Sequence, residues 1–462
     1  MRKIALYAFA FFILLSPLKG AQTIPEPETI QLKNGLTVFF LEQSELPLVA
    51  FRLILKGAGT AYEPVEGLAD LTAQLLLKGT TEKSAEVIAE EIEFLGASFS
   101  SEAQSELMEM SGSSLAENFT AFMTIVSDCL LRPALNSKEF EKERQRRIET
   151  IKSIKDNPGW AVRYYFRKVY FASHPMGHLD IGTQTSLENM NVQNVRDFYS
   201  HYIRPEQAIM AVVGNITSDA LKRLLNSTLS GWSRTGSPVS PPKLPDFPVL
   251  QGKTCVLIDM PDASQAYFVL GVPGYRMGDD RTPAAEVLNT LFGGRFTSWL
   301  NTELRIKRGL TYGASSRFQS WREGGIFTIS SYTRNDKIGE MLDITFDLLA
   351  KARTEGFQMD EIESSKNYIC GQFPPTLESL LAKVDAFTTL SFYDLGFDYY
   401  EELLEQIEQM AKAKVDAAAR QFLPAQDYVL VLVGRAEDIR QQLAKFGNFR
   451  EKKISEPGFS SK

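Results

Sequence analysis

The chain has 462 residues, a length that accommodates two or more domains of ordinary size. Hydrophobic residues make up 44% and charged residues 23%, which is typical of a packed globular protein and excludes an intrinsically disordered chain. The formal net charge of −7 gives no basic excess, so nucleic acid is not an expected partner. The three cysteines cannot form a disulfide framework, and metal or acid–base chemistry has only three histidines to draw on, His174, His178 and His201.

The first 20 residues are typical of a secretory signal peptide. Arg2 and Lys3 precede an apolar run from Ile4 to Leu15, which is too short to cross a bilayer. Residues 1–20 are therefore predicted to be removed, and an uncleaved membrane anchor is the alternative. We expect the mature protein to be secreted across the inner membrane into the periplasm and to stay free of the membrane.

The rest of the chain divides into two halves with one plan, joined by a proline-rich connector. The connector, residues 237–250, is expected to be extended, because its closely spaced prolines prevent a helix or a central strand. The first half, residues 21–236, is predicted to have strands over 36–42, 48–56 and the run that ends at Gly214, and helices over 65–78, 83–95, 116–131, 137–155 and 217–229. The second half, residues 251–462, is predicted to have strands over 253–260, 265–272 and the run that ends at Gly434, and helices over 281–292, 337–355, 358–373, 376–391, 398–421 and 436–446. Strands mixed with apolar-faced helices indicate the α+β class, with two homologous domains that each consist of a sheet and helices.

Residues 57–83, GAGTAYEPVEGLADLTAQLLLKGTTEK, resemble the zinc-binding segment of the inverzincin peptidases, the family of pitrilysin, insulin-degrading enzyme and the mitochondrial processing peptidase. In that family, the motif G-L-A-H-x-x-E-H supplies two histidines that bind zinc from one helix face and a glutamate that activates the zinc-bound water. The flanking residues 67–69 and 78–80 match, but the three chemical positions hold Asp70, Ala73 and Gln74. Ala73 cannot act as a base, Gln74 is a weak neutral ligand, and Asp70 alone could offer an oxygen to a metal.

The third zinc ligand of this family is a glutamate on a later helix, which corresponds to the predicted helix over 137–155. The resemblance places that ligand on Thr150, whereas Glu149 is rotated by about 100° around the helix and is expected to point away. The resemblance therefore implies neither a metal ligand nor a catalytic residue in this chain. On a purely structural interpretation, the helix over 65–78 packs its leucines on the sheet, and the charged residues 141–149 form a solvated face with i,i+4 pairs.

Residues 291–318, LFGGRFTSWLNTELRIKRGLTYGASSRF, resemble the second signature of the same family. In the family, an arginine and a tyrosine seven residues apart hold the substrate backbone and help to stabilise the oxyanion of the tetrahedral intermediate. The resemblance assigns these substrate-binding roles to Arg305 and Tyr312, since fixed donors act strongly on developing negative charge in a water-poor cleft. Arg308 is a second candidate for the functional arginine. The structural alternative is a surface ion pair for Arg305 and a half-buried Tyr312 at a strand edge.

Other motifs in the chain are expected to be structural. The segment from His174 to His178 contains the proline and glycine of a turn, and His201 is expected at a helix end. The sequence has no G-x-S-x-G motif for a serine nucleophile and no phosphate-binding glycine loop.

The two signatures together imply a divided function. Some members of this family are heterodimers, in which one subunit keeps the zinc site and the other supplies the arginine–tyrosine pair. The resemblance implies that this chain is the second kind: half of a clamshell that binds peptides, is inactive alone, and contributes to a metalloendopeptidase only in a complex. Zinc is then expected in the partner subunit, and no cofactor in this chain. The alternative is a non-enzymatic assembly, scaffold or peptide-binding protein of the same fold.

Overall fold

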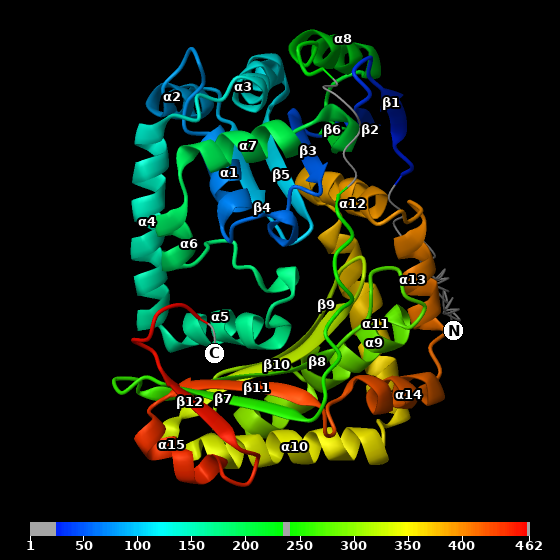
Figure 1. The fold of residues 1–462 in the computed structure, drawn as a ribbon. Coiled ribbons are helices and arrows are strands. Elements are labelled where there is room, and N and C mark those ends of the chain that lie inside the picture. The colour runs from blue at the N-terminus through cyan, green and yellow to red at the C-terminus, as the bar shows by residue number, and fades with distance from the viewer. Residues whose placement is uncertain (1–24, 234–240, 460–462) are drawn as a thin grey trace, which may run out of the picture.

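The computed structural model describes residues 25–233 and 241–459, and it contains two six-stranded sheets with helices packed on them (Figure 1). The predicted signal peptide and residues 237–240 of the predicted connector lie outside the described residues. The α+β class and the two sheet-plus-helix domains are confirmed.

The two sheets share the order of five strands and differ in the sixth strand, at one edge. The first has the order β1-β2-β6-β3-β5-β4, and the second has the order β12-β7-β11-β8-β10-β9. In both, an early strand (β2 or β7) pairs parallel with a late strand of the same half (β6 or β11), and the three strands beyond that pair are joined antiparallel. The sixth strand differs, because β1 pairs antiparallel with β2 whereas β12 pairs parallel with β7. The strands of the first sheet are β1 (Glu28–Gln31), β2 (Thr37–Glu42), β3 (Leu48–Lys56), β4 (Ser98–Ala103), β5 (Leu107–Leu115) and β6 (Ala208–Gly214). Those of the second are β7 (Lys253–Asp259), β8 (Gln265–Pro273), β9 (Ala314–Ser320), β10 (Gly325–Arg334), β11 (Tyr428–Gly434) and β12 (Phe449–Lys453).

The sequence prediction missed the two strands at one end of each sheet. These are β4 and β5 in the first sheet and β9 and β10 in the second, and all four contain several serines. Serine lacks the branched apolar side chain that marks a strand in sequence, so the alternation in these segments is weak. One face of each strand pair is polar as a result.

The helices follow the predicted plan in part, since three helices of the first half, over 158–171, 184–189 and 192–202, lie outside the predicted ranges. The predicted helix over 398–421 is two helices, because the chain leaves the helix at Gln409 and buries Met410 in the second core. A helix that was not predicted follows α4, because Asn157 accepts a hydrogen bond from the Trp160 amide and Pro158 opens a new helix. The helices of the first half are α1 (Leu68–Leu76), α2 (Ala85–Phe94), α3 (Phe119–Leu131), α4 (Ser137–Asp156), α5 (Pro158–Phe171), α6 (Gln184–Asn189), α7 (Val192–Tyr202) and α8 (Ser218–Thr228). Those of the second half are α9 (Thr282–Asn289), α10 (Ile338–Thr354), α11 (Met359–Thr376), α12 (Leu380–Phe392), α13 (Tyr399–Glu408), α14 (Lys412–Phe422) and α15 (Ala436–Leu443), with two π-helical segments, η5 (Thr290–Gly294) and η6 (Asn301–Lys307).

Each half contributes one helix to the sheet of the other half. Helix α5 of the first half packs on β8 and β11 of the second sheet, and helix α12 of the second half packs on β3 and β6 of the first (Figure 1). Each of these helices covers the inner part of its sheet and leaves the serine-containing end strands open. The two halves therefore form a single packed unit with two open sheet faces.

Arg52 ties α12 to the first sheet. This buried arginine on β3 forms ion pairs with Glu109 on β5 and with Asp385 on α12, the latter at 2.8 Å. Its guanidinium also donates to the Thr388 hydroxyl at 2.7 Å. One side chain thus joins a strand pair of the first half to a helix of the second.

The described part of the connector packs between the halves. Residues 241–250 contain no helix or strand, in agreement with the predicted extended connector. The Phe247 ring contacts Phe171 of the first half and Trp321 of the second, with ring centroids 5.7 and 5.9 Å apart.

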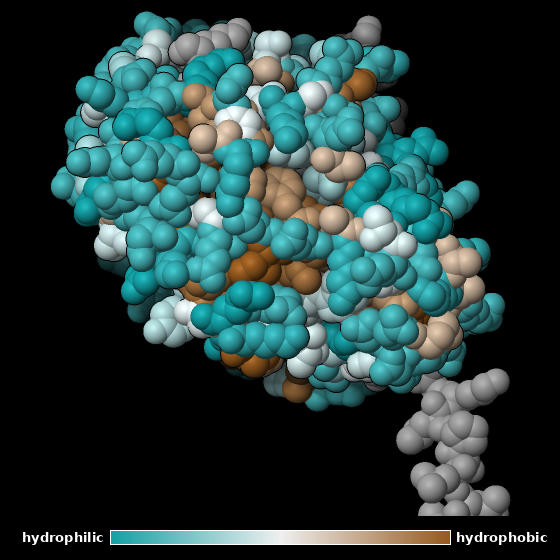
Figure 2. Space-filling model, turned by 90° about the horizontal axis from the view of Figure 1, so that it is seen from below, coloured by the Kyte–Doolittle hydropathy of each residue, from teal (hydrophilic) through white to brown (hydrophobic). Residues whose placement is uncertain are grey.

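The face at the bottom of Figure 1 is mostly hydrophilic. Figure 2 shows this face, with hydrophobic side chains visible between hydrophilic ones. No described helix combines the length and the apolar character needed to cross a membrane.

The substitution Arg52→Ala tests how much this contact between the halves contributes to the free energy of unfolding, in comparison with an exposed ion pair. We expect Arg52→Ala to lower the free energy of unfolding by about 3–5 kcal/mol, because it leaves Glu109 buried without its partner. The matched control is Arg334→Ala, which breaks an exposed pair with Asp336 and should cost less than about 0.5 kcal/mol in the same urea titration. Equal losses for both variants would contradict the account.

Candidate functional site

An ion pair joins the two helices that carry the positions matched to the zinc ligands. Helix α1 carries Asp70 and helix α4 carries Arg147, and their side chains meet with 2.6 Å between Oδ2 and Nη2. The other carboxylate oxygen of Asp70 accepts the Ala103 N–H at 2.9 Å, and Arg147 donates to the Asp180 carbonyl at 3.0 Å. Both oxygens of Asp70 are therefore engaged by this chain's own donors.

The apolar face of α1 fixes the direction of these side chains. As predicted, the leucines of α1 are buried in the first core, and they are Leu68, Leu71, Leu75 and Leu76. The opposite side of the helix then faces β4, where the Gln74 amide donates to the Ser101 carbonyl at 2.9 Å. Ala73 is fully buried and offers no polar atom.

Two of these contacts occupy the free edge of β4. Backbone groups alternate in direction along a strand, and Gln104 bonds to Leu107 on the β5 side. Ser101 and Ala103 therefore direct their backbone groups to the side away from β5, where Gln74 and Asp70 bind them. A peptide that pairs with this part of β4 has to displace both side chains.

Helix α4 departs from the solvated face that the sequence predicts over 141–149. Glu143 is 5% exposed and Arg147 is 2% exposed, so the prediction is wrong for these two residues. The helix turns both toward α1, where Arg147 lies 3.5 Å from Glu143 as well as against Asp70. Glu149 points to solvent, as expected, and pairs with Lys152.

The charges in this cluster balance one another. Burial raises the pKa of Asp70, and the charge of Arg147 opposes that rise. For Glu143, burial also acts to raise the pKa, but the hydrogen bond from Arg146 and the charge of Arg147 outweigh it, so the pKa lies below its usual value. The cluster therefore holds a cationic guanidinium between two carboxylates.

The side chains present do not fit a zinc ion. Asp70 is already bound by Arg147 and a backbone amide, and Gln74 donates rather than accepts. The Thr150 hydroxyl donates to the Arg146 carbonyl of its own helix at 2.9 Å. A buried guanidinium next to these positions also repels a divalent cation. Among the described residues, no three His, Cys, Asp or Glu side chains come together in a way that could hold a metal.

The residues of the second signature lie at the surface. Tyr312 is 78% exposed, and Arg305 stacks on the exposed Phe296 ring with 4.7 Å between the guanidinium carbon and the ring centroid. Exposed Ile306 lies beside Arg305 in the same π-helical segment, η6. Arg308 is fully exposed beyond the end of η6. The structural alternative of a half-buried Tyr312 is therefore wrong.

A buried asparagine holds the loop that carries Tyr312. Asn301 accepts the Ala314 N–H at 3.2 Å and donates to the Ala314 carbonyl at 2.8 Å, which pairs η6 with the start of β9. The chain turns between them at Gly309, whose φ of +60° is the left-handed region that favours glycine. Thr333 on β10 then donates to the Leu310 carbonyl at 2.6 Å. The loop is thus fixed at both ends while Tyr312 points outward.

Arg305 and Tyr312 cannot reach the Asp70 cluster of their own chain. A hollow of about 400 Å³ is lined by Asp70 and by Gln319, which lies near the far end of β9. Tyr312 precedes the other end of this strand, and seven residues of extended chain span roughly 23 Å. The structure therefore places the two signatures at separate points of the molecule.

Comparisons with known proteins give two domain matches, one that lies in the first half and one that lies mostly in the second. Residues 42–179 match the insulinase domain of peptidase family M16, and residues 189–369 match the domain described as the peptidase M16 inactive domain. The two matched domains belong to one family and together cover well over half of the chain. The chain belongs to peptidase family M16. This confirms the family that the sequence resemblance predicts.

Several similar proteins match this M16 chain in sequence or structure over most of its length. An uncharacterized zinc protease of Bacillus subtilis, YmxG, is 25% identical over 403 residues, which cover 87% of this chain and 96% of the relative. An uncharacterized zinc protease of Rickettsia bellii is 28% identical over 346 residues, 73% of this chain and 81% of the relative. The crystal structure of a peptidase M16 inactive domain from Pseudomonas fluorescens is similar with a TM-score of 0.82 at 24% identity, covering 88% of this chain and 97% of that one. A protease from Helicobacter pylori is similar with a TM-score of 0.83 at 19% identity, covering 89% and 100%.

Glu63 gives the start of α1 a measurable pH dependence. Its buried carboxylate accepts the N–H groups of Gly67 and Ala69 at 2.8 and 2.7 Å, and burial raises its pKa to about 7. The folded state then binds a proton that the unfolded state releases above its pKa of 4.5, so stability falls as pH rises between 4.5 and 7. The total change from this group is about 3 kcal/mol. Urea titrations at pH 4.5, 6 and 7.5 should show that Glu63→Gln removes this part of the slope; an unchanged slope would contradict the assignment.

Proposed function

We propose that this chain is the non-catalytic, substrate-binding subunit of a heterodimeric zinc metalloendopeptidase. In this role it supplies Arg305 and Tyr312 to the active site of a zinc-bearing partner subunit that cleaves peptides. The chain itself holds no zinc. The predicted signal peptide supports a periplasmic location for this chain, and the partner subunit is then expected in the same compartment. Relatives named as zinc proteases make a role in proteolysis the natural one for this fold.

The observation that carries the proposal is the ion pair between Asp70 and Arg147. This pair joins α1 and α4, and in the peptidases that the chain resembles the corresponding helices are joined by zinc. With Ala73 at the position of the general base, the cluster has no group that activates a water for attack on a peptide bond.

The position of the second signature supports action in a partner's site. A guanidinium and a phenol are donors suited to an oxyanion. Here Tyr312 is exposed on a firmly held loop, and Arg305 is partly exposed on the Phe296 ring in η6. Since Tyr312 lies roughly 23 Å along β9 from the end that meets Asp70, the pair has no reacting centre in its own chain to serve. The exposed side chains of Phe296 and Ile306 beside Arg305 give this region the apolar surface that a subunit contact buries.

Substitution of the arginine and tyrosine tests the shared site. The chain is mixed with a zinc-bearing sister subunit, and cleavage of a fluorogenic peptide is followed. We expect Arg305→Ala to lower kcat about 10²-fold and Tyr312→Phe about 10-fold or more, because each removes a donor to the oxyanion. Arg308→Ala is the matched control and should leave kcat within about twofold.

Full activity for both Arg305→Ala and Tyr312→Phe would contradict the proposal. A complex that forms and cleaves nothing would instead favour the scaffold or peptide-binding alternative. A loss for Arg308→Ala without one for Arg305→Ala would move the role to the neighbouring arginine.

Zinc binding by the isolated chain tests the other half of the proposal. Isothermal titration calorimetry of the wild type should give no stoichiometric zinc site, and the chain alone should show no chelator-sensitive peptide hydrolysis. Restoring the motif with Asp70→His, Ala73→Glu, Gln74→His and Thr150→Glu should give strong zinc binding only when Arg147→Val is added, since the guanidinium repels the metal. One zinc per wild-type chain would contradict the proposal.

A further inference from the structure

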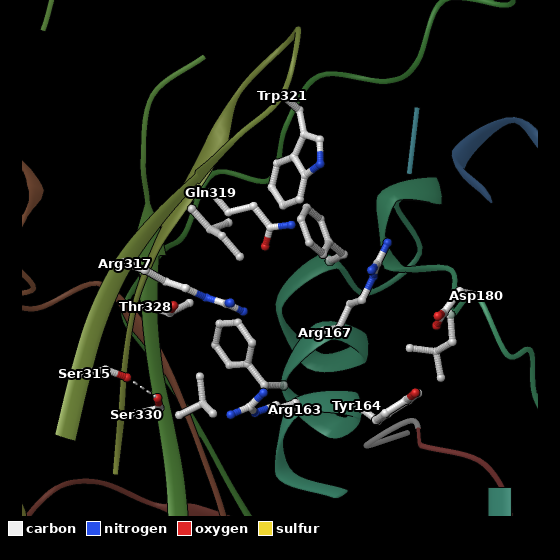
Figure 3. A pocket seen from close by; sticks show the side chains of 15 residues that line it. Arg163, Tyr164, Arg167, Asp180, Ser315, Arg317, Gln319, Trp321, Thr328 and Ser330 are labelled. Carbon is white, nitrogen blue, oxygen red and sulfur yellow. Dashed lines mark hydrogen bonds between the residues drawn. The ribbon is translucent and has the colours of Figure 1, made fainter. Parts of the chain in front are cut away.

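A second hollow lies between α5 and the open face of the second sheet. It has a volume of about 280 Å³ and is lined by side chains of α5, β9 and β10 (Figure 3). Three of them are arginines: Arg163 and Arg167 on α5, and Arg317 on β9. We call this hollow the arginine pocket. In Figure 3, Arg317 and Arg163 point into the same space from opposite walls.

Two of the three guanidinium groups, those of Arg163 and Arg317, have neither a hydrogen bond nor an ion pair in the described part of the chain. Arg317 forms no ion pair there, and burial together with the charge of Arg163 lowers its pKa. Arg163 contacts the face of the Trp160 ring at 5.9 Å. Arg167 is bound to the Met176 carbonyl at 3.0 Å and to a serine hydroxyl. Three cationic side chains against the single carboxylate of Asp180 leave the pocket with an excess of positive charge, which favours the binding of an anion.

The other lining groups suit a carboxylate. The hydroxyls of Ser315 and Ser330 lie 3.2 Å apart on neighbouring strands, and Thr328 and Gln319 add a hydroxyl and an amide. Planar guanidinium groups bind a carboxylate with two parallel hydrogen bonds. Asp180 also lines the pocket, and it makes no ion pair with Arg163 or Arg317.

The arginine pocket continues into the hollow that contains Asp70. The two hollows share four lining residues, Arg167, Asp180, Gln319 and Trp321. An extended peptide along β9 therefore passes from the Asp70 end to the guanidinium groups. On the first sheet, the serine pair Ser100–Ser111 lies at the corresponding pair of end strands, and Glu102 of β4 lines the hollow that contains Asp70.

We propose that the arginine pocket binds a carboxylate of an extended peptide, either an Asp or Glu side chain or the C-terminal carboxylate. The proposal names a peptide class for the substrate-binding role above. Its test uses the isolated chain without a zinc-bearing partner, so the two proposals can fail separately.

Fluorescence anisotropy with four labelled peptides of one neutral, extended sequence tests the proposal. One carries an internal Glu and an amidated C-terminus, one a free C-terminal carboxylate and no acidic side chain, one neither, and one a Lys in place of Glu. At least one carboxylate peptide should bind roughly tenfold more tightly than the neutral peptide at low salt. The comparison of the first two peptides identifies which carboxylate the pocket takes.

Substitutions of the pocket arginines test whether the peptide carboxylate binds in the arginine pocket. Arg317→Gln and Arg163→Gln should each remove most of the tenfold preference, and Arg317→Glu should reverse it toward the Lys peptide. Arg440→Gln on α15 is the matched control, because it removes one positive charge from an exposed pair with Glu451 on β12. Equal binding of all four peptides, no binding of any, or equal loss in the Arg440→Gln control would overturn the proposal.

Discussion

The exchange of helices between the two halves is the constraint on which the rest of the molecule depends. Each half covers one face of its sheet with its own helices, whereas α5 covers the other face of the second sheet and α12 that of the first, so neither half buries both faces of its sheet alone. Because each helix covers β-strands at the middle of the sheet, the polar faces of β4 with β5 and of β9 with β10 remain open. The same packing fixes the distance between the two signatures. Asp70 and one end of β9 line the same hollow, and Tyr312 precedes the other end of this strand.

The Asp70–Arg147 pair explains how the fold keeps its shape without a metal at this point. In the resembling peptidases, zinc joins the helices that correspond to α1 and α4. Here a buried carboxylate and a buried guanidinium join them, with Glu143 and two backbone groups completing the arrangement. A buried ion pair requires further hydrogen bonds to offset the loss of hydration, and the contacts of Arg147 with the Asp180 carbonyl and of Asp70 with the Ala103 amide supply two of them. The helices therefore stay in place without a metal. The side chains at the matched positions are hydrogen-bond donors or acceptors that are already bound, and none of them can act as a general base.

Sequence alone predicted the parts of the structure that have strong apolar patterns. The strands β3, β6 and β11 are rich in branched residues, and the buried leucines of α1 have helical spacing. The serine-containing strands lack this signal, although they carry the open faces. In α4, the neighbours Arg146 and Arg147 look alike in sequence, and only the packing of α4 against α1 shows that Arg147 is buried. The end of α13 has no glycine or proline to mark it. The residues of both family signatures were located from the sequence, but the separation between them follows from the length of β9.

The distance between Tyr312 and the zinc of the partner subunit tests the central claim most directly. A spin label is attached at Tyr312→Cys in a Cys370→Ser background, since the other two cysteines are buried, and the partner is loaded with a paramagnetic divalent metal. Pulsed electron paramagnetic resonance then measures the distance from label to metal in the complex. The account predicts about 10 Å, because a side chain that binds the oxyanion has to lie next to the metal site. A distance beyond about 25 Å, the length of β9 within one chain, would contradict it.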